Sequence, residues 1–297
     1  MTGKNVVIIG AGNIGQTLAK IIRKNSKSVK LWDKDQSKNP KQKPLLKIIP
    51  EADFVFFCFP SSSFRVTVKT IAPFLKKQAV IISLAKGVTE NALETVDAVL
   101  KKNLRANQKI SLLAGPFLAG EIRQGLPAFG VIASQQKVTF EKIKKLFAHS
   151  SIHLEFSSDL KGVALSSSLK NVYALLLGAV DGLKFGMNTK GYLATRAAEE
   201  MEEIVKTLGG KHETAMGPAG LGDLITTGFS LYSKNRQLGE TLAKKNRIIT
   251  KSEGYRSVDC FIKILTKKSK KFPLLLGLDK IIKNPKQTGS IIREFLK

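Results

Sequence analysis

Short apolar runs alternate with helical patterns over the first half of the chain. Seven apolar runs have the length and flanks of buried strands: Val6–Ile9, Val29–Trp32, Phe54–Phe59, Ala79–Ser83, Lys109–Ala114, Phe129–Ala133 and Ile152–Phe156. Helices are expected between them at Ile14–Lys24, Ser63–Leu75, Asn91–Lys101 and Thr139–His149. The polar stretch Asp35–Lys47 contains two prolines and is expected to be a loop. This alternation predicts a doubly wound, mostly parallel sheet.

The strand pattern stops near residues 156–159, and long helical patterns follow. They are expected at Leu160–Leu183, Lys190–Leu208, Leu238–Lys245, Ser257–Lys267 and Leu275–Lys283. A chain of 297 residues is long enough for about two domains. The predicted fold class is therefore α/β, with a mostly parallel sheet in a domain at residues 1–157 and an all-α domain at residues 158–297.

A glycine-rich turn joins the first predicted strand to the first predicted helix. Gly10, Gly12 and Gly15 have the spacing G-x-G-x-x-G. The first glycine is expected to make the tight turn, the second to let a pyrophosphate approach, and the third to let helix and strand pack closely. Asp33 ends the second predicted strand roughly 20 residues later, where a ribose-binding carboxylate is expected. The sequence thus predicts a Rossmann-type dinucleotide-binding domain, with an ordinary glycine-rich turn as the alternative.

The choice between NAD and NADP depends on two neighbouring residues. Asp33 would accept a hydrogen bond from a ribose 2′-hydroxyl and repel a 2′-phosphate, whereas Lys34 could receive that phosphate. The expected cofactor is therefore NAD or NADP, with NAD slightly favoured.

The chain is strongly basic. It has 49 lysines and arginines against 23 acidic residues, a formal net charge of +26. Such a charge suggests nucleic-acid binding, but the lysines are dispersed over predicted helix faces and form no strip interleaved with aromatic residues. We therefore expect solvated lysines that attract anionic ligands and no specific nucleic-acid partner. A nucleic-acid surface and weak association with anionic lipid or other polyanions are the alternatives.

Other classes of protein are disfavoured by what the sequence lacks. Two cysteines are too few for a disulfide framework, and the three histidines have no metal-ligand spacing, so no metal is expected. We expect no signal peptide before the first strand, and the apolar segment 172–180 is too short to span a bilayer. These features predict a cytoplasmic protein, and a homodimer is left open.

Candidate chemistry is spread over four segments. Lys86 follows a predicted strand at the sheet edge where ligands bind, and Gly115 lies in a second strand-end turn. Lys170 lies in an apolar helix, where desolvation would lower its pKa toward the range of a general base. Asp223 could hold a lysine in position, and the segment Ser233–Arg236 could clamp a phosphate. For Lys86 the alternative is a solvated surface lysine, and for Lys170 it is a lysine that extends from the edge of its helix to water. For the turn at Gly115 the alternative is a plain connecting loop.

Taken in order, these segments resemble the NAD(P)-dependent sn-glycerol-3-phosphate dehydrogenases of the bacterial type over nearly the whole chain. The matching segments are Gly10–Ala19, Ser83–Val88, Gly115–Glu121, Leu169–Leu183, Arg196–Glu203, Gly217–Leu224, Ser233–Arg236 and Glu253–Arg256. The run Leu169-Lys170-Asn171-Val172, together with the later Gly-Leu-Gly-Asp-Leu at 220–224, is more specific than the glycine fingerprint.

The resemblance implies hydride transfer between C2 of sn-glycerol 3-phosphate and a nicotinamide, giving dihydroxyacetone phosphate, in the synthesis of glycerophospholipid precursors. Lys170 would be the acid/base at the C2 oxygen, Lys86 would polarise or anchor the substrate, and Asp223 would orient the lysines. The implied substrate-binding residues are Lys86, Gly115, Phe117, Lys170, Asn171, Asp223, Ser233, Lys234, Asn235 and Arg236. The implied cofactor-binding residues are Gly10, Gly12, Asn13, Ile14, Gly15, Asp33, Lys34, Lys86, Ala119, Lys234, Lys251 and Glu253.

The chain departs from the family pattern at several positions. Phe117 stands where a serine or threonine is usual, and Ile14 where a tryptophan is common. Lys234 replaces an arginine, so a two-pronged donor becomes a point charge, for which Arg236 could compensate. The segment 35–50 is shorter than usual. These changes leave two alternatives: a related dehydrogenase for another small anion such as a β-hydroxyacid, and a catalytically weakened NAD-sensing protein.

Overall fold

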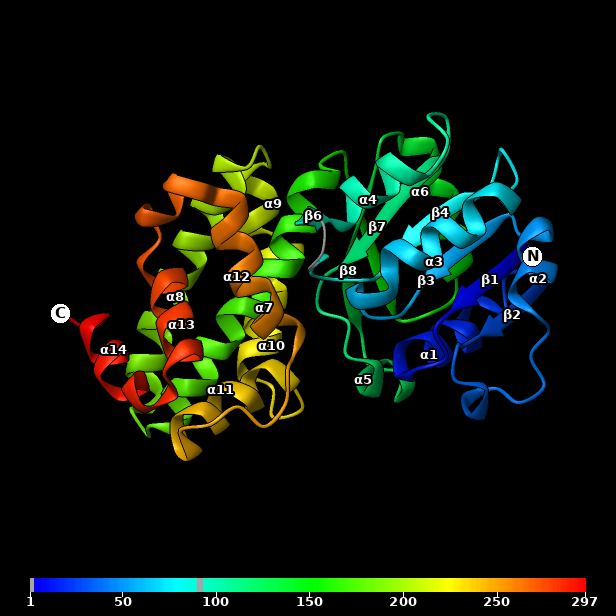
Figure 1. Ribbon diagram of the computed structural model, residues 1–297. Coiled ribbons are helices and arrows are strands. Elements are labelled where there is room, and N and C mark those ends of the chain that lie inside the picture. Colours follow the sequence, from blue (N-terminus) through cyan, green and yellow to red (C-terminus); the bar gives the residue numbers. More distant parts are fainter. Residues whose placement is uncertain (1–2, 90–92) are drawn as a thin grey trace. The chain divides into compact units, whose positions relative to one another are not determined.

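The computed structural model describes residues 3–89 and 93–297 (Figure 1). The chain divides into two compact units, which are named here the sheet unit (Met1–Ala85 and Val96–Leu160) and the helical unit (Lys86–Thr95 and Lys161–Lys297). The short segment Lys86–Thr95 thus belongs to the helical unit, although it lies within the first half of the sequence. The domain boundary expected after residue 157 stays a prediction.

The sheet unit is built on a sheet with the strand order β2-β1-β3-β4-β7-β8-β9. All neighbouring strands are parallel except β7 and β8. The strands are β1 (Asn5–Ile9), β2 (Ser28–Trp32), β3 (Phe54–Phe57), β4 (Val80–Ser83), β7 (Lys109–Ala114), β8 (Ala128–Ser134) and β9 (Ile152–Ser157). The seven expected strands are all present, which confirms the mostly parallel sheet.

Every residue of β3 and β4 is buried, as expected for parallel strands covered on both faces. The α-helices of this unit are α1 (Asn13–Ile22), α2 (Leu45–Ile48), α3 (Phe64–Ile71), α4 (Val96–Asn103), α5 (Ala119–Arg123) and α6 (Lys137–Lys144).

Two expectations about this unit, a loop and a helix start, were wrong in part. The loop expected to extend to Lys47 gives way to α2 at Leu45, because Ile48 and Ile49 are buried in the core.

The helix expected from Asn91 begins instead at Val96. Residues 91 and 92 lie outside the described residues. Glu94 and Thr95 form β6, which pairs with β5 (Val88–Thr89) in a small antiparallel hairpin of the helical unit.

The helical unit is organised around α7 (Leu160–Gly182), and the most apolar stretch of this helix is entirely buried. Among the described residues α7 is the one helix long and apolar enough to cross a membrane, but its burial is that of a core helix. The other helices are α8 (Gly186–Thr207), α9 (His212–Met216), α10 (Asp223–Phe229), α11 (Lys234–Lys245), α12 (Glu253–Leu265), α13 (Pro273–Lys283) and α14 (Thr288–Glu294). The long helices expected after residue 158 are confirmed.

Glycines allow α11 and α12 to approach α7 closely. A Cβ on Gly239 of α11 would lie 1.9 Å from the carbonyl oxygen of Leu175, and one on Gly254 of α12 would lie 2.1 Å from that of Asn171. No side chain fits at such distances, so these crossings require glycine. These crossings bring polar residues of α11 and α12 close to those of α7.

We expect Gly239→Ala to destabilise the protein by about 1–3 kcal/mol, because the methyl group would push α11 away from α7. Gly191→Ala is the matched control, since Gly191 also lies inside a helix but a Cβ there meets nothing within 4 Å. The control should be stabilising by about 0.5–1 kcal/mol, because alanine has the higher helix propensity. Urea unfolding of both variants measures the difference. Equal stabilisation of both would contradict the close crossing.

Candidate active site

Two lysines converge on one buried aspartate within the helical unit. Lys170 lies in the middle of α7, and Asp223 begins α10 directly after a π-helical turn at Pro218–Gly222. The Nζ of Lys170 donates to Asp223 Oδ1 at 3.0 Å, and the Nζ of Lys86 donates to Asp223 Oδ2 at 2.6 Å. The side chains of Lys170 and Asp223 are only 7% and 3% exposed, whereas that of Lys86 is 21% exposed. Lys170 therefore does not extend to bulk water.

Thr227 completes this cluster and was not expected from the sequence. Its hydroxyl accepts a hydrogen bond from Lys170 Nζ at 2.6 Å and donates to Asp223 Oδ1 at 3.2 Å. Thr227 follows Asp223 by four residues on α10, so the two side chains share one helix face. That spacing is the signal by which it could have been found. An ammonium group has three N–H donors, and two of those on Lys170 have partners among the described residues, which leaves the third for a ligand.

The cluster lowers the pKa of Lys170 toward neutrality. Burial is the main cause, and with the nearby charge of Lys86 it lowers the pKa of Lys170 to about 8 against the opposing attraction of Asp223. Burial would raise the pKa of the Asp223 carboxyl, but the two ammonium groups outweigh it and hold that pKa below its ordinary value. Asp223 therefore stays ionised, and Lys170 can gain or lose a proton near neutral pH.

Lys86 is tied to the helical unit through the residue that follows it. The N–H of Gly87 donates to the hydroxyl of Ser168 on α7 at 2.8 Å, and Ser168 is fully buried. Gly87 has a φ of 105°, a conformation that favours glycine. Val88 then enters the apolar core of the helical unit. Lys86, Lys170 and Asp223 are thus assembled by one compact unit of the chain.

A second polar group lies next to Lys170 and joins three helices. Asn235 of α11 donates to Asn171 Oδ1 at 2.9 Å, and Asn171 Nδ2 donates to Glu253 of α12 at 3.4 Å. The N–H of Gly254 donates to Asn235 Oδ1 at 2.9 Å. The structure therefore brings together three residues expected to contact substrate or cofactor: Asn171, Asn235 and Glu253.

The start of α11 shows which groups of the expected phosphate clamp are engaged. Ser233 caps the helix, its hydroxyl accepting the N–H of Arg236 at 3.2 Å. The guanidinium of Arg236 is buried and donates to Asp181 at 2.6 Å and to Glu240 at 3.3 Å. Lys234 is exposed at the first position of the helix. Of the two cations in this segment, Lys234 is the one that faces solvent.

The glycine turn of the sheet unit fits a dinucleotide. A Cβ on Gly10 would lie 2.5 Å from the carbonyl oxygen of Cys58, and one on Gly15 would lie 1.8 Å from that of Gly10. A Cβ on Gly12 meets nothing within 4 Å, so the packing of the protein itself does not require a glycine there. Gly12 directly precedes α1, and no side chain caps the N–H groups of the first turn of this helix. These N–H groups are therefore open to a pyrophosphate. Asn13 and Ile14 form the first turn of α1.

Asp33 is used by the sheet unit itself. Its Oδ2 accepts the N–H of Ala11 at 2.7 Å, and its Oδ1 accepts the N–H of Asp35 at 2.9 Å. The Nζ of Lys38 lies 3.6 Å from Oδ1, a cation that the sequence analysis did not single out. Lys34 is exposed. Asp33 thus ties the end of β2 to the glycine turn, and its contact with a ribose stays a prediction.

The remaining predicted residues are divided between the two units. Gly115 has a φ of 130°, and a Cβ there would lie 2.6 Å from the carbonyl oxygen of Phe129. The ring of Phe117 packs against Gly130, and Ala119 begins α5 of the same unit. Lys251 belongs to the helical unit, where its Nζ lies 5.8 Å from the ring centre of Tyr255. Among the described residues, no group of three or more His, Cys, Asp and Glu side chains could hold a metal ion.

Sequence models of one enzyme family match both halves of the chain. The model described as NAD-dependent glycerol-3-phosphate dehydrogenase N-terminus matches residues 40–140, and the model of its C-terminus matches residues 159–293. The chain is 31% identical to glycerol-3-phosphate dehydrogenase (NAD(P)+) of Clostridium botulinum, over 98% of this chain and 96% of the relative. It is 27% identical to the same enzyme of Fusobacterium nucleatum, with the same coverage of both chains.

A solved structure agrees with the sequence comparison. The crystal structure of glycerol-3-phosphate dehydrogenase from Coxiella burnetii is 25% identical, with a TM-score of 0.89 over 100% of both chains. The comparisons, the glycine turn and the lysine–aspartate cluster lead to the same family, and the departures at Ile14, Phe117 and Lys234 do not alter that assignment. This chain belongs to the family of NAD(P)-dependent glycerol-3-phosphate dehydrogenases.

Proposed function

We propose that this protein interconverts sn-glycerol 3-phosphate and dihydroxyacetone phosphate by hydride transfer with NAD(P)(H). The observation that carries the proposal is the buried Lys170, whose pKa is lowered to about 8 and whose ammonium is held by Asp223. A group with these properties suits the transfer of a proton to or from the C2 oxygen of the substrate. The names of the relatives support the substrate, and the glycine turn supports the cofactor.

Lys170 has opposite roles in the two directions. When dihydroxyacetone phosphate is reduced, a hydride reaches C2 and the protonated Lys170 gives its free proton to the carbonyl oxygen. When glycerol 3-phosphate is oxidised, neutral Lys170 takes the proton of the C2 hydroxyl as the hydride leaves. The bound nicotinamide supplies or accepts that hydride. Asp223 and Thr227 keep the Nζ of Lys170 in place in both directions.

Lys86 supplies a second positive charge to the site. Two ammonium groups share the single charge of Asp223, so the cluster keeps a net positive charge when Lys170 is protonated. That charge stabilises the negative charge that develops on the C2 oxygen during reduction. The rival functions, another small-anion dehydrogenase and an NAD-sensing protein, have no specific observation in their favour.

Three finer assignments belong to the same proposal. The protein uses NAD in preference to NADP, because Asp33 would repel a 2′-phosphate, although Lys34 and Lys38 lie close by. It contributes glycerol 3-phosphate to phospholipid synthesis, in which that compound is the backbone. It acts in the cytoplasm, where the nicotinamide pools are available.

We expect the purified protein to oxidise NADH with dihydroxyacetone phosphate and to show no measurable rate with unphosphorylated dihydroxyacetone. Lys234→Ala should raise the KM for dihydroxyacetone phosphate roughly tenfold, because an ammonium–phosphate contact is lost. Lys234→Arg should keep or lower that KM, since arginine can donate two parallel hydrogen bonds. Steady-state kinetics with NADH and with NADPH measure these effects and the cofactor preference. Equal rates with both ketones would contradict the proposed binding of the substrate phosphate.

The pH profiles of the two directions should be mirror images. Reduction needs protonated Lys170, so its rate should fall as pH rises through about 8, and the rate of oxidation should rise over the same range. Lys86→Met should move both midpoints to higher pH, because a neighbouring positive charge is removed. Lys170→Met should lower kcat about 10²-fold or more while NADH binding, followed by fluorescence, is unchanged. A Lys170→Met variant with most of its kcat would place the acid/base elsewhere.

Ser168→Ala should lower kcat/KM for dihydroxyacetone phosphate about tenfold, because the buried N–H of Gly87 loses its acceptor and Lys86 loses its position. Ser167→Ala is the matched control: both serines donate to the carbonyl oxygen of Ala164, at 3.1 Å for Ser167 and 2.8 Å for Ser168, but only Ser168 binds Gly87. The control should keep its activity, and NADH affinity should be unchanged in both variants. Equal losses of kcat/KM would show a general packing effect instead.

A further inference from the structure

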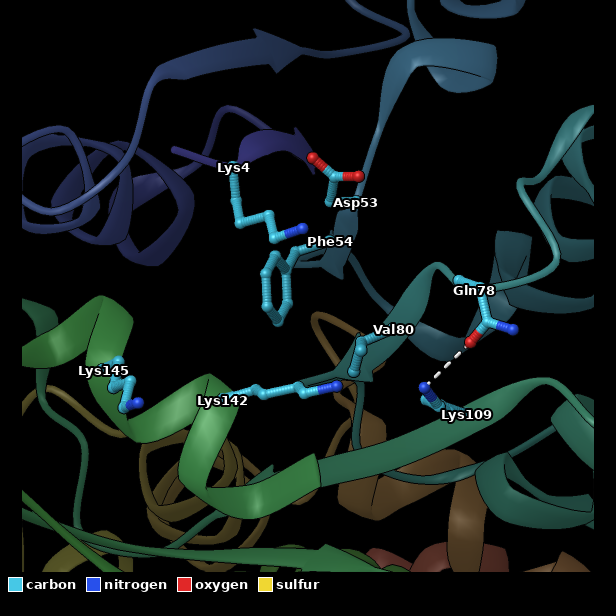
Figure 2. Close-up of a pocket in the computed structure, with 8 residues that line it drawn as sticks. All are labelled: Lys4, Asp53, Phe54, Gln78, Val80, Lys109, Lys142 and Lys145. Atoms are coloured by element: carbon cyan, nitrogen blue, oxygen red, sulfur yellow. Dashed lines mark hydrogen bonds between the residues drawn. The ribbon is translucent and has the colours of Figure 1, made fainter. Parts of the chain in front are cut away.

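A cavity of about 480 Å³ lies in the sheet unit, away from the glycine turn (Figure 2). It is lined by Lys4, Asp53, Phe54, Gln78, Val80, Lys109, Lys142 and Lys145. Three of these residues lie at the amino ends of β3, β4 and β7, and Lys4 immediately precedes β1. These strands are parallel, so their amino ends share one edge of the sheet, whereas the glycine turn follows the carboxyl end of β1. The cavity is therefore separate from the predicted dinucleotide site.

Four lysines give this cavity a strong positive charge. Within residues 3–89 and 93–297, no carboxylate lies within 4.0 Å of the Nζ of Lys4, Lys109, Lys142 or Lys145. Lys109 donates to the side-chain oxygen of Gln78 at 3.0 Å, which holds its ammonium at the wall. Figure 2 shows Lys4 and Lys142 entering the cavity from opposite sides. Like charges gathered in this way attract an anion.

The one carboxylate of the lining has partners of its own. Asp53 accepts the backbone N–H of Asn5 at 2.9 Å and pairs with Lys76 at 3.2 Å, and Lys76 is not part of the lining. Burial would raise the pKa of Asp53, but the bond from Asn5 and the charges of Lys76 and Lys4 hold it below its ordinary value. Asp53 is ionised, and its charge is balanced largely by Lys76. The cavity therefore keeps an excess of positive charge.

The inner wall of the cavity is apolar. Phe54 and Val80 contribute carbon atoms there, and Figure 2 shows the ring of Phe54 between the lysines. A recess of this volume is in the range that binds small organic ligands. Phe54 is only 4% exposed and Val80 only 3%, so these residues close the floor of the cavity and the lysines are the groups that a ligand would contact.

We propose that this cavity binds a small polyphosphate, organic or inorganic, with its phosphates among the lysines. The ligand is a small molecule rather than a nucleic acid, because the lysines surround one recess and form no continuous strip. This site is independent of the redox reaction proposed above, and it gives part of the chain's excess of lysines a binding role.

The test uses ATP without Mg²⁺ as the probe, titrated calorimetrically into the full-length protein. Excess NADH is present so that the glycine turn is occupied. Lys4→Gln/Lys142→Gln should weaken ATP binding about tenfold, because two phosphate contacts are lost. The control Lys267→Gln/Lys268→Gln removes the same charge from exposed positions of the helical unit and should change the affinity less than about twofold. Circular dichroism verifies the fold of both variants.

Two further probes identify what the cavity recognises. Inorganic triphosphate should bind within about threefold of ATP, because the lysines contact the phosphates alone. A single-stranded oligonucleotide should bind no more tightly than ATP. Equal losses in the two double variants, no binding of ATP in the presence of excess NADH, much weaker binding of inorganic triphosphate than of ATP, or tighter binding of the oligonucleotide would each overturn the proposal.

Discussion

The ion pairs of Asp223 with Lys86 and Lys170 are the interaction on which the interior of the helical unit depends. Two ammonium groups are directed at one carboxylate that is almost wholly removed from water. Removing one partner of a buried ion pair costs about 3–5 kcal/mol, because the remaining charge is left without compensation. Here the loss of the carboxylate would leave two positive charges facing each other. Stability and reactivity therefore rest on the same three side chains.

That arrangement is maintained by close backbone packing around α7. A Cβ on Gly239 or Gly254 would lie only 1.9 or 2.1 Å from the carbonyl oxygen of Leu175 or Asn171, so α11 and α12 can lie this close to α7 only with glycine at these positions. The amide of Asn171 lies beside Lys170 in the sequence and is held by the same helices. A rigid framework of this kind suits proton transfer, because the position of Nζ must be kept within a fraction of an ångström.

Local sequence patterns were sufficient to predict most of the fold, because most strands are short apolar runs and the helices are longer segments, apolar on one face or, in α7, on all sides. Lys170, Asp223 and Lys86 could be named as candidates, since a lysine in an apolar helix and a lysine after a strand are both unusual. Their mutual distances could not be predicted, because they arise from packing between segments far apart in the sequence. Thr227 was missed because a threonine four residues after an aspartate is common. The structural engagement of Asp33 and Arg236 was also hidden, since a charged residue in a sequence does not reveal which partner it has in the fold.

The membership of Lys86–Thr95 in the helical unit affects how this protein can be divided. The polypeptide passes from one unit to the other three times, after Ala85, after Thr95 and after Leu160. A C-terminal fragment that begins near residue 158 would contain Lys170 and Asp223 but would lack Lys86 and the hydrogen bond from Gly87 to Ser168. Exchange of modules with a relative would therefore need to carry this ten-residue insert along with the C-terminal half, because a single crossover point would combine the insert of one protein with α7 and α10 of the other.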